Sequence, residues 1–109
     1  MENEVEKLAL DFQRMQSQYQ MLLVQKNQLQ LQAEEIKLAL EELKSTKGKV
    51  YRNVGTIMFE ADRESLSKDL AERQENIDVR LKSVAQQEAR LKPQLDDMKK
   101  RLESLIGSG

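Results

Sequence analysis

The sequence contains no cysteine, histidine or tryptophan, a single proline and only four aromatic residues. Without histidine and cysteine the chain has no imidazole base, no thiolate nucleophile and no zinc ligands of the usual nitrogen and sulfur kind. Its glycines form no phosphate-binding loop, and its acidic pairs are expected on solvated helix faces. We therefore expect no enzyme, no catalytic residues, no cofactor and no metal site. The scarcity of aromatic rings also disfavours a compact globular core.

Charge and hydropathy exclude two further classes of partner. The chain has 18 Lys and Arg against 19 Asp and Glu, which gives a net charge of −1. This balance disfavours binding to nucleic acid or to an anionic membrane, and the longest wholly apolar run, residues 21–24, is too short to span a bilayer. The acidic start MENEVEKLAL does not resemble a signal peptide, and the lack of cysteine fits a reducing compartment. We expect a cytoplasmic protein with neither nucleic-acid nor membrane partners.

Apolar residues recur at alternating spacings of three and four in two long segments, residues 1–46 and 63–106. A heptad repeat sustained over this length predicts coiled-coil helices, whose seam is the row of apolar positions that face the partner helix. The predicted seam of the first segment is Met1, Val5, Leu8, Phe12, Met15, Tyr19, Leu22, Lys26, Leu29, Ala33, Ile36, Leu40 and Leu43. That of the second is Leu70, Gln74, Ile77, Leu81, Val84, Glu88, Leu91, Leu95, Met98, Leu102 and Leu105.

The segment between the helices, residues 47–62, has a different composition. Gly48 ends the first helix, and β-branched and aromatic residues on both sides of Gly55 predict two strands. Gly55 suits the turn because glycine adopts positive φ without steric cost, and Asp62 suits the N-cap of the second helix. The sequence thus predicts a mainly α protein in which a β-hairpin joins two antiparallel coiled-coil helices. Residues 107–109 are expected to be a disordered tail or a remnant of cloning.

Three features leave alternatives open. Lys26 and Glu88 fall in adjacent seam layers, where they either form an ion pair that fixes the register or reach out to solvent separately. Pro93 predicts a kink near residues 89–93, which either lets the end of the helix flex or has no role. The position opposite the first seam is repeatedly apolar, which indicates contact with a neighbour or a ligand, or else tolerated exposure. These outward residues are Leu10, Val24, Leu31 and Leu38.

The predicted hairpin points to assembly with other chains. An isolated pair of strands is marginally stable in water and leaves two edges of unpaired backbone groups. Hairpins from several chains can close a small barrel, whereas the alternative is a hairpin folded back on its own helices. The residues expected to mediate assembly are Val50, Tyr51, Val54, Ile57 and Phe59.

The stretch KVYRNVGTIMFEADRESLSKDLAERQENIDVRLKSVAQQEARL resembles the β-type subunits of prefoldin, an ATP-independent chaperone. The similarity is most specific over residues 50–91, and room for a single hairpin favours the β type over the α type. The resemblance implies a hexamer of two α-type and four β-type chains around a double β-barrel platform. It also implies capture of unfolded client proteins at the coiled-coil tips and their transfer to a group II chaperonin. Assembly of the chain with itself is left open, and Pro93 departs from the family's pattern.

The free end of the helices is the expected client-binding site. Terminal turns have unsatisfied backbone groups and fray, which exposes apolar seam residues that adapt to many sequences. The residues expected there are Met1, Val5, Leu8, Leu102, Leu105 and Ile106. The alternative is that these residues only close the seam. The alternative function is accordingly a structural coiled-coil adaptor or spacer that holds no clients.

Overall fold

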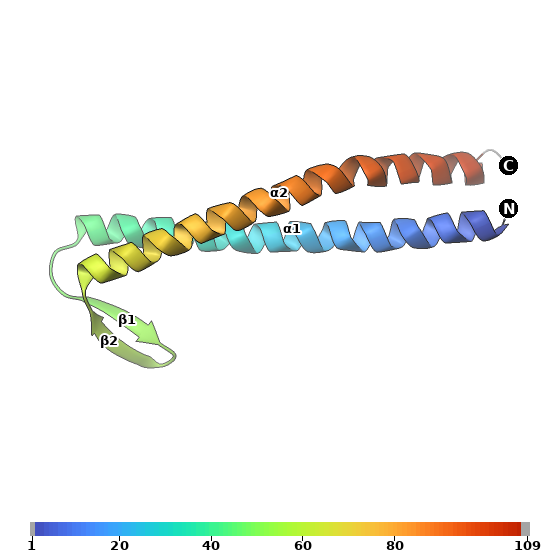
Figure 1. The fold of residues 1–109 in the computed structure, drawn as a ribbon. Coiled ribbons are helices and arrows are strands. Elements are labelled where there is room, and N and C mark those ends of the chain that lie inside the picture. Colours follow the sequence, from blue (N-terminus) through green and yellow to red (C-terminus); the bar gives the residue numbers. More distant parts are fainter. Residues whose placement is uncertain (1, 108–109) are drawn as a thin grey trace. The chain divides into compact units, whose positions relative to one another are not determined.

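The computed structural model describes residues 2–107. Its elements in chain order are α1 (Glu2–Ser45), β1 (Val50–Val54), β2 (Ile57–Ala61) and α2 (Arg63–Gly107) (Figure 1). The predicted order of helix, hairpin and helix is confirmed. The chain divides into two compact units, one made of Met1–Asn27 with Lys82–Gly109 and the other of Gln28–Leu81.

The unit that contains both helix termini is held together along the predicted seam. Val84 and Leu95 of α2 are its most buried residues, with 3% and 8% of their surface exposed. The facing α1 segment runs in the opposite direction and contributes half-buried side chains at every predicted seam position from Val5 to Lys26. Leu105 is an exception because 53% of its surface is exposed, so the tight part of the seam ends before it.

The unit that contains the hairpin also buries apolar residues at predicted seam positions. Leu29 and Leu43 of α1 and Ile77 of α2 are buried, and the intervening seam positions of α1 are half-buried. Every buried residue of the described chain lies at a position that the heptad repeat predicts. Apolar side chains at spacings of three and four lie on one face of a helix, so removal of that face from water drives the pairing.

The strands β1 and β2 form an antiparallel ribbon closed by a two-residue turn. Val54 pairs with Ile57, so Gly55 and Thr56 alone make the turn. Gly55 has a φ of 61°, whereas no residue other than glycine has a positive φ in the described chain. A positive φ at the first central residue only is the pattern of a type II′ turn, whose twist matches that of the strands. The predicted role of Gly55 is confirmed.

Asp62 is the N-cap of α2, as predicted. Its Oδ2 accepts a hydrogen bond of 3.1 Å from the backbone N–H of Ser65, and its carbonyl accepts one of 2.9 Å from the N–H of Leu66. These bonds satisfy backbone donors that the first turn of a helix leaves unpaired.

Arg63 joins the end of α1 to the start of α2, a contact that the heptad pattern does not predict. Its guanidinium donates hydrogen bonds to the carbonyl of Leu43, in the last turn of α1, and to the carbonyl of Gly48, the latter at 2.9 Å. The last carbonyls of a helix have no partners within it and carry the negative end of its dipole, so a cation is favourable there. One side chain thereby fixes the chain reversal.

Pro93 does not interrupt α2, which continues as one helix to Gly107. The kink stays a prediction, and Gly107, expected in the tail, is the last helical residue. Residues 108 and 109 lie outside the described residues. Within residues 2–107, neither helix has a stretch apolar enough to cross a membrane.

Candidate functional site

One face of the hairpin carries exposed apolar side chains from both strands. The register places Val50, Arg52 and Val54 of β1 on the same face as Ala61, Phe59 and Ile57 of β2, respectively. Val54, Ile57 and Phe59 expose 58%, 59% and 52% of their surface. Neighbouring apolar residues exposed to this degree are typical of an interaction site rather than of a free surface. The structure therefore brings together four of the residues expected to mediate assembly.

Tyr51 lies on the opposite face of the ribbon from these four residues. It pairs across the strands with Glu60, and its neighbour on that face is Met58. Both apolar side chains are exposed, Tyr51 at 53% and Met58 at 64%. Because successive side chains of a strand point to opposite faces, Tyr51 cannot share a barrel interior with Val50 and Val54.

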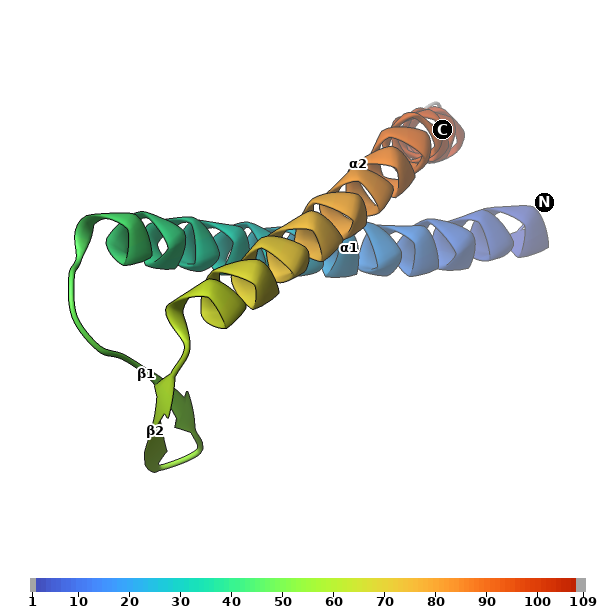
Figure 2. The ribbon, with the colours of Figure 1, turned by 60° about the vertical axis from the view of Figure 1, so that its left-hand side comes forward.

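An ion pair links the hairpin to α2. Arg52 Nη2 lies 3.3 Å from Asp69 Oδ2, and the two side chains are 41% and 48% exposed. A small pocket of about 190 Å³ separates Phe59 from Leu66 beside this pair. Figures 1 and 2 show the ribbon projecting from the chain reversal. The exposure of Val54, Ile57 and Phe59 contradicts the alternative of a hairpin buried against its own helices.

In the unit that contains both helix termini, an apolar groove of about 380 Å³ follows the last turns of α2. It is lined by Phe12 of α1 and by Leu102 and Ile106 of α2, with Lys99 and Glu103 at its rim. Two of the predicted client-binding residues, Leu102 and Ile106, therefore share one surface. Phe12 was expected only in the seam, because the heptad pattern does not show which seam side chains also border a groove.

The other predicted tip residues are placed differently. Val5 and Leu8 are half-buried in the seam, and Leu105 is exposed but does not line the groove. Met1 lies outside the described residues. The outward residues of α1 are all solvent-exposed, with exposed fractions between 54% and 65%: Leu10, Val24, Leu31 and Leu38.

A polar cluster interrupts the seam in the unit that contains the termini. Lys26 Nζ lies 3.1 Å from Glu88 Oε2, with the two side chains 33% and 20% exposed. The hydroxyl of Tyr19 donates a long hydrogen bond of 3.5 Å to Glu88 Oε1. The structure thus decides between the two alternatives in favour of an ion pair and shows that separate solvation is wrong. Tyr19 is a partner that sequence reasoning missed.

We expect this ion pair to contribute measurably to stability. In a double-mutant cycle with Lys26→Met and Glu88→Met, urea unfolding should give a coupling energy of about 1 kcal/mol. The reason is that partial burial reduces the screening of the pair by water. Tyr19→Phe serves as the control, since it removes the hydroxyl and leaves the ion pair. A coupling energy of zero would show that the seam charges act independently.

No group of three or more acidic side chains within residues 2–107 is arranged to hold a metal ion. The hairpin face and the tip groove both expose apolar side chains.

Comparison with known proteins identifies the family. A family model described as "Prefoldin subunit" matches residues 6–109. The chain belongs to the prefoldin subunit family. It is 41% identical over 59 residues to prefoldin subunit beta of Methanocella arvoryzae, an alignment that covers 54% of this chain and 47% of that protein. It is 38% identical over 58 residues to prefoldin subunit beta of Methanothrix thermoacetophila, covering 53% and 48%.

The prefoldin fold extends over nearly the whole chain. The crystal structure of the prefoldin beta subunit from Thermococcus strain KS-1 superposes with a TM-score of 0.80 at 28% identity, and the match covers 94% of this chain and 92% of that chain. In sequence, by contrast, the alignments span about half the length of the curated relatives. The predicted resemblance to β-type prefoldin subunits is confirmed, as is the fold of two coiled-coil helices joined by a hairpin.

Proposed function

We propose that the chain is a holdase subunit that captures unfolded polypeptides without ATP and passes them to a group II chaperonin. The match of the prefoldin family model to residues 6–109 is the observation that carries this proposal. Prefoldin subunits are chaperone components, and the apolar surfaces of this chain suit polypeptide binding rather than catalysis.

In this proposal the hairpin is the assembly element. Four β-type chains join two α-type chains, or the chain joins copies of itself, and the hairpins close into a barrel platform. The support is physical: a free ribbon leaves unpaired strand edges, and one face of this ribbon exposes Val54, Ile57 and Phe59. Pairing with other hairpins would satisfy those edges and bury that face.

Clients are held at the opposite end of the helices. Phe12, Leu102 and Ile106 offer a shallow apolar groove that suits side chains of many shapes. A single groove of this size binds weakly, but several tips on one platform raise the avidity by orders of magnitude. This arrangement explains a broad client range without a specific pocket.

The competing function is a structural adaptor, in which the tips bind one folded partner. Suppression of aggregation separates the two functions: an assembled holdase should keep a dilute denatured protein from scattering light without nucleotide. The expected result is that a few tips per client molecule suppress light scattering, and that added ATP does not change this suppression. If scattering rises as fast as in the presence of an unrelated coiled-coil protein, the adaptor function holds.

A further inference from the structure

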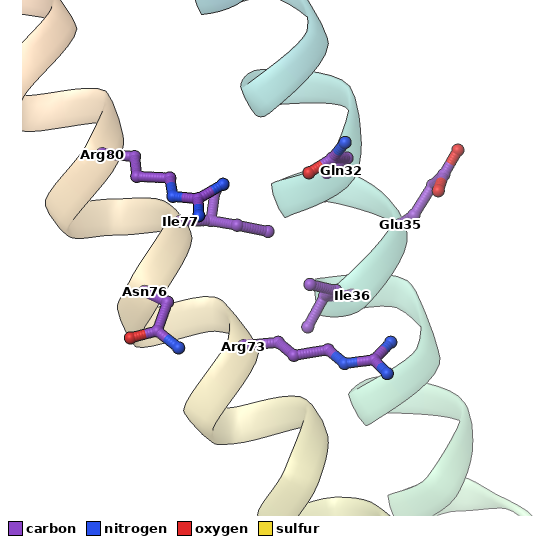
Figure 3. Close-up of a pocket in the computed structure, with 7 residues that line it drawn as sticks. All are labelled: Gln32, Glu35, Ile36, Arg73, Asn76, Ile77 and Arg80. Atoms are coloured by element: carbon purple, nitrogen blue, oxygen red, sulfur yellow. The ribbon is translucent and has the colours of Figure 1, made fainter.

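The unit that contains the hairpin has a second groove, which the proposed function does not use. It lies between α1 and α2 and has a volume of about 350 Å³ (Figure 3). Ile77, only 8% exposed, and the half-buried Ile36 form its apolar floor. Arg73, Asn76 and Arg80 border it along α2.

The two arginines that border this groove are unpaired. Among the described residues, Arg52 pairs with Asp69 and Arg63 caps α1, whereas Arg73 and Arg80 have neither an ion-pair nor a hydrogen-bond partner. The other groove residues of α1 are Gln32 and Glu35. Figure 3 shows the Glu35 carboxylate directed away from both guanidinium groups. The groove therefore presents two cations over an apolar floor.

The spacing of the arginines defines the shape of a ligand. They are seven residues apart on one helix, which places their backbones about 10.5 Å apart along the axis. In a peptide in the polyproline II conformation, which has three residues per turn and a rise of about 3.1 Å per residue, side chains three positions apart lie on the same side and about 9 Å apart. Guanidinium groups bind carboxylates through two parallel hydrogen bonds, so two carboxylates at that spacing match both arginines.

We propose that this groove binds an acidic peptide segment in the polyproline II conformation, whose two carboxylates, three residues apart, pair with Arg73 and Arg80. The amide of Asn76, between the two arginines in sequence, is available to hydrogen-bond the peptide backbone. This site takes charged segments, whereas the tip groove takes apolar ones, and it does not depend on the client-holding function.

Comparison with another groove of the chain shows that the arginine pair is particular to the first groove. That groove, of about 400 Å³, lies two heptads away, toward the N-terminus of α1 and toward the C-terminus of α2, with Leu22 for Ile36 and Leu91 for Ile77. Its floor is also apolar, but Gln87 stands where the first groove has Arg73, and its one arginine, Arg90, stands where the first groove has Asn76. The apolar floor thus recurs along the coiled coil, whereas the pair of arginines is present in the first groove and absent from the second.

The test uses a fluorescein-labelled peptide with two Asp residues three positions apart, and a matched peptide with Asn at both positions. Fluorescence anisotropy with the assembled protein should show that the Asp peptide binds at least about tenfold more tightly than the Asn peptide. Arg73→Gln with Arg80→Gln should remove this preference. The matched control, Arg90→Gln with Arg101→Gln, deletes the same charge from α2 outside this groove and should keep it.

A charge exchange keeps the test decisive if the Gln variant is unstable. Arg73→Glu with Arg80→Glu should reject the Asp peptide and bind a peptide with Lys at both positions, which the native protein should not bind. Equal binding of the Asp and Asn peptides, or native Asp-peptide binding by the Gln variant, would overturn the proposal. Aggregation suppression, measured on the same variants, should stay at the native level, because the tip groove is unaltered.

Discussion

Aspartate at both Ile57 and Phe59 is expected to abolish assembly. The strand register places these two side chains on one face of the hairpin together with Val54, and more than half of each is exposed in the isolated chain. Burying two carboxylates in this interface costs several kcal/mol, because the one cation on the face, Arg52, is already paired with Asp69. A cost of about 4 kcal/mol weakens association about a thousandfold. Light scattering of the chain, alone or with an α-type subunit, should then report unassembled species.

The matched control for this variant uses the other face of the same ribbon. Asn53→Asp with Met58→Asp adds the same charge at a directly paired position of β1 and β2. If one face lines a barrel interior, this control should assemble normally. Equal loss of assembly in both variants would show that the hairpins do not join through the face of Val54, Ile57 and Phe59.

The helical core was predictable from the sequence because burial in a coiled coil follows a one-dimensional period. Leu29, Leu43, Ile77, Val84 and Leu95 are all seam positions, and all are buried. The turn and the start of α2 were predictable for a related reason, since Gly55 and Asp62 act on backbone groups within a few residues of themselves.

Contacts between side chains far apart in sequence were predictable only in part. The seam period placed Lys26 near Glu88 but did not show whether the two would pair, and it gave no indication of Tyr19. Arg63 reaches the carbonyl of Leu43 only because the chain reverses at one particular geometry. The heptad repeat along each helix gives no information about the geometry of the chain reversal between the helices. The same reason explains why the tip groove was missed while two of its residues, Leu102 and Ile106, were named.

Serine at both Leu105 and Ile106 is expected to remove most of the aggregation suppression while leaving the fold intact. These residues expose 53% and 68% of their surface, so their substitution costs the folded chain little apolar burial. Covering each of them with a client would contribute about 1.5 kcal/mol, or roughly tenfold in affinity per residue. Loss of this contact at every tip compounds through avidity. At least about ten times more protein should be needed for half-maximal protection of a denatured client.

The control for the tip variant removes an equivalent apolar surface elsewhere. Leu31→Ser with Leu38→Ser changes two outward residues of α1 that are 65% and 58% exposed. Their substitution should leave protection unchanged if clients bind at the tip, because they lie in the unit of the hairpin and do not line the tip groove. The opposite pattern, with protection lost in the Leu31 and Leu38 variant and kept in the tip variant, would assign client binding to the outward row. In that case the client is the partner that the repeated apolar positions of the outward row indicate, and the tip residues serve only to close the seam.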